Sequence, residues 1–147
     1  MRELSEEDIA RVVQLSQKTN QMNVCTNRWN ESDIRAFAVN PAHKVFTLRS
    51  SDRFGDLGLV AFVHVEVSGD TAEVIDWVMS CRAMNRGIEV SFEREVERRL
   101  VQAGARKLFA TWKKSAKNAP SRDLFDRLGF ALEEESETVR RYARTVK

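Results

Sequence analysis

The chain has 147 residues, 42% of them hydrophobic and 31% charged, which fits one globular domain over residues 1–147. Its 24 basic and 22 acidic residues are interspersed and leave a net charge of +2, so we expect no nucleic-acid partner. No apolar run approaches the roughly 20 residues of a membrane helix, and the charged start is unlike a signal peptide, so we expect a cytoplasmic protein without a membrane partner. Cys25 and Cys81 are too few for a disulfide framework and have no clustered zinc ligands nearby, so we expect free thiols and no metal.

Two helices are predicted in the first forty residues. Ser5 and Asp8 have the spacing of a capping box, and apolar side chains at helical intervals extend the first helix to about Lys18. An amide-rich stretch, residues 19–27, follows it, and a second, short helix is expected around residues 34–38. The connection between the two helices is therefore unusually polar.

From residue 43 onward the apolar residues alternate, which is typical of strands. Turn-forming Gly and Asp residues divide this segment into three strands of an antiparallel meander. A long helix that ends at Gly104, a strand, a last helix and two final strands complete the chain. The expected ranges are 45–49, 57–67 and 72–79 for the meander, 85–104 for the long helix, 107–112 for the next strand, 118–128 for the last helix, and 130–132 and 138–146 for the final strands.

The order of these elements resembles that of the GNAT (acyl-CoA N-acyltransferase-like) proteins. The resemblance implies an α/β fold with a mixed, mostly antiparallel central sheet flanked by helices, and a truncated first strand at residues 2–4. It also implies that the central strands splay apart near Met79 and Lys107 and open a cleft bounded by Gly87 and Asn118. Because a natural domain start would include the whole first strand, we expect a domain cut from a longer polypeptide, with an independent gene as the alternative.

A phosphate-binding segment is expected where the meander gives way to the long helix. There the sequence reads SCRAMNRGIE over residues 80–89, and free backbone N–H groups with the helix dipole favour a phosphate. The segment resembles the GNAT pyrophosphate loop, whose pattern is Q/R-x-x-G-x-G/A. Gly87 matches the middle glycine, whereas Met84 and Glu89 stand at the other two positions. The residues that the resemblance makes candidates for cofactor binding are Arg82, Asn85, Arg86 and Gly87.

Four short segments resemble a narrower family. They are QKTNQMN at residues 17–23, RFGD at 53–56, MSCR at 79–82 and AKNAP at 116–120. Together they resemble the carboxyl-terminal, GNAT-like half of FkbH-like proteins. This resemblance implies a role in loading a glyceryl unit onto an acyl carrier protein in polyketide-type biosynthesis, with a haloacid-dehalogenase-type domain as partner in cis or in trans. The chain itself lacks the D-x-D-x-T motif of that second domain.

The acyl donor is expected to be a phosphopantetheine thioester on a carrier protein, rather than coenzyme A. Glu89 puts a carboxylate in the first turn of the long helix, where it stabilises the helix dipole but would repel a diphosphate. A carrier protein's pantetheine arm brings a single phosphodiester, with which Arg82 or Arg86 could pair. Ordinary surface charge explains these two arginines equally well.

Three residues are candidates for catalysis. Asp76 interrupts an apolar strand and is the leading general base, with His64 on the preceding strand as its partner. A buried aspartate that holds a loop, and a structural histidine, are the alternatives. Cys81 could become an acyl acceptor if nearby N–H groups and Arg82 lower its thiol pKa, or it is an ordinary free thiol. Phe125 stands where GNAT enzymes often place a proton-donating tyrosine, so direct transfer would need another acid, and packing is its expected role.

Substrate contacts are expected in the amide-rich loop and at the start of the last helix. The resemblance places this loop on the acceptor side of the cleft, where a hydroxylated acyl group such as glyceryl needs hydrogen-bond donors and acceptors. A solvated loop is the alternative. Asn118 stands where GNAT proteins often contact the pantetheine, and it could also cap the last helix. The loop candidates are Thr19, Asn20, Gln21 and Asn23.

Two functions follow from these expectations. The first is an acyltransferase-like domain that handles a glyceryl-type thioester on a carrier protein, with Asp76, His64 and Asn118 lining the cleft. The alternative is a catalytically silent module that docks a carrier protein. Carrier proteins are typically acidic, so both functions involve the basic residues around the inferred cleft mouth. These are Arg82, Arg86, Lys113, Lys114 and Lys117.

Overall fold

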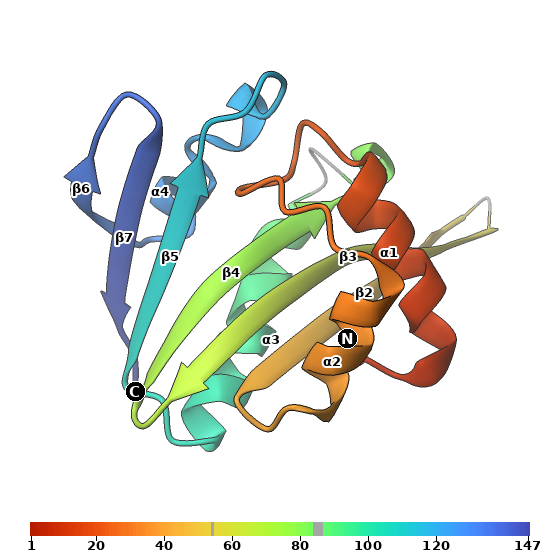
Figure 1. The fold of residues 1–147 in the computed structure, drawn as a ribbon, viewed down its shortest axis with the longest axis horizontal. Coiled ribbons are helices and arrows are strands. Elements are labelled where there is room, and N and C mark those ends of the chain that lie inside the picture. Colours follow the sequence, from red (N-terminus) through yellow and green to blue (C-terminus); the bar gives the residue numbers. More distant parts are fainter. Residues whose placement is uncertain (54, 84–86) are drawn as a thin grey trace.

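The computed structural model describes residues 1–53, 55–83 and 87–147. Its strands form one twisted sheet with helices on both faces (Figure 1). The strands are β1 (Arg2–Glu3), β2 (His43–Asp52), β3 (Gly55–Ser68), β4 (Thr71–Met79), β5 (Lys107–Lys113), β6 (Ala131–Glu135) and β7 (Val139–Thr145). The helices are α1 (Ile9–Lys18), α2 (Glu31–Val39), α3 (Ile88–Gln102) and α4 (Leu124–Arg127), with one-turn 3₁₀ helices η1 (Glu6–Asp8), η2 (Cys81–Ala83) and η3 (Ala119–Ser121).

The described strands form a seven-stranded sheet in the order β1-β2-β3-β4-β5-β7-β6. Every neighbouring pair is antiparallel except β4 and β5, which are parallel. The mixed, mostly antiparallel sheet and the meander of β2, β3 and β4 are therefore confirmed. The first strand is truncated as expected, because β1 contributes only two residues, which pair with Phe46 and Thr47 of β2.

Helices α1 and α2 cover one face of the sheet, and α3 and α4 cover the other (Figure 1). Val12 and Leu15 lie on the buried stripe of α1, and Phe92, Val96 and Leu100 recur every fourth residue on that of α3. Each such side chain contributes roughly 1.5–3 kcal/mol when it leaves water. None of the described helices has the length and apolar character needed to cross a membrane.

A β-bulge in β4 decides which of its side chains share a face. His64 of β3 pairs with Asp76 of β4. The next residue of β3, Val65, pairs with Val74 rather than with Ile75. The extra residue reverses the alternation of side chains, so Val74 and Trp77 both join the core on the α3 side. Asp76 is turned to the opposite face, beneath α2 and the loop that precedes it.

Strands β4 and β5 pair only at their beginnings. The parallel register starts with Thr71 opposite Lys107 and ends at Val74, and beyond it the strands separate toward Met79 and Lys113 (Figure 1). The predicted splay is therefore present, but the position predicted for its β5 side is wrong. Lys107 begins β5 and lies at the closed end, because in a parallel pair the strand end near Met79 is matched by the end of β5.

Residues 22–25, here called the bridging loop, lie between the separated ends of β4 and β5. On the β4 side, the Met22 carbonyl accepts a hydrogen bond from the Met79 N–H (2.9 Å). On the β5 side, the Val24 carbonyl accepts one from the Lys113 N–H (2.8 Å). The loop thus satisfies backbone groups that the divergence of the strands would leave without partners.

Two predicted caps do not form. The hydroxyl of Ser5 donates to the carboxylate of Asp8 rather than accepting from a helix N–H. The helix expected over residues 118–128 is broken into η3 and α4, and the side chain of Asn118 does not cap it, because that amide is bound elsewhere. Gly129 does end the segment, with a φ of 89° that glycine adopts without strain.

Candidate functional site

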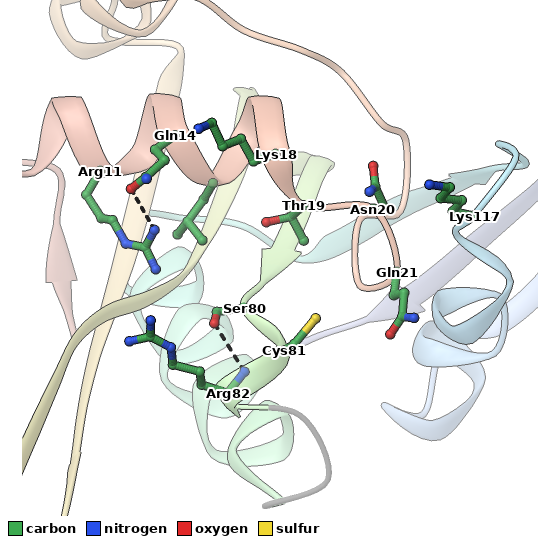
Figure 2. A pocket seen from close by; sticks show the side chains of 11 residues that line it. Arg11, Gln14, Lys18, Thr19, Asn20, Gln21, Ser80, Cys81, Arg82 and Lys117 are labelled. Carbon is green, nitrogen blue, oxygen red and sulfur yellow. Dashed lines mark hydrogen bonds between the residues drawn. The ribbon is translucent and has the colours of Figure 1, made fainter.

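A pocket of about 470 Å³ lies at the end of β4, between α1, the loop that follows α1, and η2 (Figure 2). This volume is in the range of small-molecule sites, roughly 300–1,000 Å³. The lining residues are Arg11, Gln14, Leu15, Lys18, Thr19, Asn20, Gln21, Ser80, Cys81, Arg82 and Lys117. The pocket therefore joins the amide-rich loop to the segment after β4.

Six residues predicted from the sequence meet in this pocket, and one of them, Lys117, lies just before η3. Thr19, Asn20 and Gln21 come from the loop after α1. Cys81 and Arg82 come from η2, on the opposite wall (Figure 2). The two groups are distant in sequence, and the sheet brings them together because α1 packs across β3 and β4, at whose end η2 begins.

Arg28 fixes the loop wall of the pocket. Its Nη1 donates to the carbonyls of Ser16 (2.9 Å) and Thr19 (2.6 Å), at the end of α1. Its Nη2 donates to Oδ1 of Asn20 (2.7 Å). Since Oδ1 is held by Arg28, Nδ2 of Asn20 is the side-chain group that this residue can offer to a ligand.

One wall of the pocket, here called the α1 wall, is formed by side chains of α1, and none of them was predicted from the sequence as a site residue. Arg11, Gln14 and Lys18 recur at intervals of three and four residues, so they share one stripe of the helix. A polar stripe is normally a solvated helix face, and only its position, directly before the amide-rich loop, could have pointed to a site. With Arg82 and Lys117, it gives the pocket four cationic side chains and no acid among its described lining residues.

Asp76 and His64 lie outside the pocket, in a buried hydrogen-bond network. The Asp76 carboxylate accepts from Nδ2 of Asn27 (2.8 Å) and Nε1 of Trp29 (2.7 Å), and it lies 2.9 Å from Nδ1 of His64. Nε2 of His64 lies 2.8 Å from Nδ1 of His43. Neither Asp76 nor His64 lines the described pocket, because the bulge turns Asp76 under the loop before α2. The geometry matches the alternative of a buried aspartate that holds a loop, and a catalytic role stays a prediction.

Asn23 and Asn118 are also buried instead of facing the pocket. Nδ2 of Asn23 donates to the Thr19 carbonyl (3.2 Å), and its Oδ1 accepts from the Thr26 N–H (2.9 Å). Nδ2 of Asn118 donates to the carbonyls of Asn23 (2.9 Å) and Lys113 (2.7 Å). These bonds hold the bridging loop in place, so both amides serve the loop rather than an open ligand site.

The predicted phosphate-binding segment is described only at its ends. Asn85 and Arg86, both predicted to bind the cofactor, lie outside the described residues, as does Met84. Gly87 is exposed and has a φ of 71°, a conformation in which most other residues are strained. Glu89 lies in the first turn of α3, as predicted, so its carboxylate stands at the helix end where a phosphate is expected.

The two thiols have different surroundings. Cys25, in the bridging loop, donates its S–H to the Thr111 carbonyl (3.2 Å), and burial raises its thiol pKa to about 12. A thiol with that pKa is protonated at neutral pH and unreactive. Cys81 is exposed at the pocket wall, and both thiols are free, as expected. Cys81 is therefore the thiol that a ligand in the pocket can reach.

Phe125 packs in the core, as predicted. It is 1% exposed, and its ring centroid lies 5.4 Å from that of Phe130 and 5.5 Å from that of Tyr142. The hydroxyl of Tyr142 donates to Asp126 (2.8 Å) on α4. Phe125 therefore supplies no proton donor, and the neighbouring tyrosine hydroxyl is already bound.

Thr26, directly after the bridging loop, is strained. Its φ is 54°, which is unfavourable for a β-branched residue, and its buried Oγ1 has no hydrogen-bond partner among the described residues. We expect Thr26→Gly to raise the free energy of unfolding by about 1 kcal/mol, because glycine adopts this conformation freely. Urea denaturation measures the difference, with Thr47→Gly in β2 as a destabilised control. A less stable Thr26→Gly protein would contradict the assignment of strain.

Comparisons with known proteins identify the fold. No protein-family profile and no curated protein matches the sequence. The ribosomal-protein-S18-alanine N-acetyltransferase from Escherichia coli matches with a TM-score of 0.72 and 16% identity, over 97% of this chain and 90% of that one. The spermidine N-acetyltransferase from Vibrio cholerae, solved with CoA and spermine, matches with a TM-score of 0.72 and 13% identity, over 98% of this chain and 93% of that one. An acetyltransferase from Thermus thermophilus matches with a TM-score of 0.66 and 14% identity, over 99% of this chain and 95% of that one. The chain therefore has the α/β fold of the GNAT acetyltransferases.

Proposed function

We propose that the chain is an acyltransferase-like domain that handles a pantetheine-linked, glyceryl-type acyl thioester in the pocket between α1 and η2. The observation that carries this proposal is the convergence there of a polar loop, an exposed thiol and four cationic side chains. The loop offers hydrogen bonds to the hydroxyl groups of the acyl unit, and the cations attract the phosphate of the pantetheine arm. The GNAT fold supports the reaction class, and the segments similar to FkbH-like proteins support the acyl class.

The loop residues suit a hydroxylated acyl group better than a plain acetyl group. Asn20 is fixed by Arg28 before any ligand arrives, so its Nδ2 is a positioned donor. Gln21 is exposed and carries both a donor and an acceptor. A glyceryl unit with two hydroxyl groups would use both amides, whereas an acetyl group would use neither.

The bridging loop restricts the route of the pantetheine arm. The backbone N–H groups of Met79 and Lys113, at the separated strand ends, are already bonded to this loop. An arm that ran between β4 and β5 would have to displace these bonds. We therefore propose that the arm reaches Cys81 from the surface, beside Arg82 and Lys117.

Coenzyme A is expected to bind no more tightly than the millimolar range. The carboxylate of Glu89 lies in the first turn of α3, where a diphosphate would need the helix N–H groups. Its Oε1 is 3.4 Å from Nη1 of Arg127, and the Glu89 side chain is 13% exposed. Glu89→Ala should strengthen binding about tenfold, since one repulsive charge leaves the helix end. Calorimetry measures this, with Glu95→Ala on the same helix as the control. Micromolar binding by the unaltered chain would contradict the expectation.

The proposed partner is an acidic acyl carrier protein, loaded by a haloacid-dehalogenase-type domain in cis or in trans. Reversing Arg82 and Lys117 to Glu should slow association with a holo acyl carrier protein at least about tenfold at low salt, because rim charges mainly set the rate of encounter. The matched control reverses Arg94 and Lys147, which are exposed outside the pocket. Surface-resonance rates at low and high salt measure the effect. Equal slowing in both double variants would argue against docking at the pocket.

A catalytically silent docking module is the second candidate. It is favoured by the buried position of Asp76 and His64 and by the packed Phe125, which leave the described pocket without a general base or a proton-donating tyrosine. This module would bind the carrier without taking its acyl group. Cys81→Ser separates the two candidates, because it removes transfer in the first and changes nothing in the second.

A further inference from the structure

We propose that the pocket binds an oxyanion, either a carboxylate or a phosphate ester, between the guanidinium groups of Arg11 and Arg82. This names the ligand class of the site and rests on the proposed function only in placing the substrate in this pocket. The inference comes from the α1 wall.

The guanidinium group of Arg11 is held in place before any ligand binds. Its Nε donates to the Leu59 carbonyl of β3 (3.0 Å), and its Nη1 donates to Oε1 of Gln14 (2.8 Å). A guanidinium has five N–H donors, so these two bonds leave others for a ligand. A group anchored in this way loses little conformational entropy when it binds an oxyanion.

Arg82 faces Arg11 from the opposite wall of the pocket (Figure 2). The backbone N–H of Arg82 donates to Oγ of Ser80 (3.2 Å), which positions the start of η2. Burial, followed by the charge of Arg82, lowers the pKa of Arg11. Two guanidinium groups that repel each other across a pocket without a described acid are stabilised by an anion between them.

Most of the other arginines that the structure describes form ion pairs with acids. Those in ion pairs with carboxylates include Arg35, Arg49, Arg98, Arg127, Arg140 and Arg144. Among the residues that the structure describes, no acid pairs with Arg11 or Arg82. What sets this pocket apart is that two such guanidinium groups face each other across it (Figure 2).

The shape of the pocket further restricts the class of ligand that it can bind. Figure 2 shows Arg11 and Arg82 at one end and Asn20, Gln21 and Lys117 at the other. A volume of about 470 Å³ leaves room for more than the anion alone. The arrangement fits a short, hydroxylated molecule that carries its oxyanion at one end.

Calorimetric titrations of the full chain at low salt test the proposal with small probes. Glycerate carries a carboxylate, and glycerol phosphate and phosphopantetheine carry phosphate esters; glycerol and pantetheine are their neutral counterparts. We expect the anions to bind and the neutral compounds not to bind. Arg11→Gln and Arg82→Gln should each weaken anion binding at least about tenfold, the effect of losing a charge-assisted hydrogen bond, whereas Arg94→Gln on α3 should leave it unchanged. Arg82 is exposed, so its replacement preserves the fold even if Arg11→Gln disturbs it.

The probes also identify the source of the oxyanion. Binding of glycerate or glycerol phosphate assigns the oxyanion to a small free acid or phosphate ester, since the carboxyl group of a thioester-linked glyceryl unit carries no charge. Binding of phosphopantetheine alone assigns it to the arm. The absence of anion binding, or anion binding that neither pocket variant weakens, overturns the proposal. No carrier protein is present in these titrations, so their outcome is independent of whether the chain transfers an acyl group from a carrier.

Discussion

Replacing Asp76 with alanine is expected to lower the free energy of unfolding by about 3–5 kcal/mol. The fully buried carboxylate is the hydrogen-bond partner of Asn27, Trp29 and His64, and its removal leaves the buried His64 and the partly buried Asn27 and Trp29 without that partner. Urea denaturation monitored by tryptophan fluorescence measures the loss. Glu66→Ala, on the exposed side of the neighbouring strand, is the matched control and should change stability by less than about 0.5 kcal/mol.

A stable Asp76→Ala protein would contradict the proposed structural role of this network. The network also bears on how activity is interpreted. Asn27 and Trp29 belong to the same loop as Thr19 and Asn20 of the pocket wall, so loosening them would disturb the pocket. A loss of activity in an Asp76 variant therefore indicates chemistry only if its stability is unchanged.

Asn118→Ala is expected to cost about 2–4 kcal/mol and to loosen the bridging loop. Its amide donates to the carbonyls of Asn23 and Lys113, and its Oδ1 accepts from the Ser115 N–H (2.8 Å). Hydrogen exchange should therefore speed up at the Lys113 N–H, which bonds to the loop, more than at amides in the centre of β3.

The control for this experiment is Asn40→Ala. Asn40 is exposed, and its Oδ1 accepts one backbone hydrogen bond, from Ala42 (3.0 Å), so a cost below about 1 kcal/mol is expected. Unchanged exchange at Lys113 in Asn118→Ala would show that the bridging loop is held without this side chain.

Local patterns were sufficient to predict most of the fold. The alternation of apolar residues from 43 to 80 predicted the meander, and the four-residue repeat from Phe92 to Leu100 predicted α3, because both periods follow from backbone geometry. The separation of β4 and β5 was predicted at the wrong end of β5, near Lys107. Its position depends on the register between these two strands, which are far apart in sequence. The last helix was predicted too long because the tertiary bonds of Asn118 replace a local cap.

The sequence pointed to those residues of the candidate site that lie at the ends of helices and strands. Cys81 and Arg82 lie within three residues of the end of β4, and Asn20 lies two residues after the end of α1, so their positions at one edge of the sheet follow from the order of elements. The face that Asp76 occupies could not be predicted, because an acid in an apolar strand indicates a buried partner but does not reveal the bulge that decides its face. Arg11 was not predicted because a helical stripe looks the same whether it faces solvent or a pocket.

Intact mass spectrometry of the domain mixed with a glyceryl-loaded acyl carrier protein tests the central proposal most directly. In the proposed step, the Cys81 thiolate attacks the thioester carbonyl, the carbon–sulfur bond to the pantetheine breaks, and the pantetheine thiolate takes up a proton. We expect the carrier to lose the glyceryl mass and the domain to gain it, and Cys81→Ser to abolish both changes. Unchanged masses of both proteins, under conditions in which surface resonance detects their binding, would contradict acyl transfer and favour the docking module.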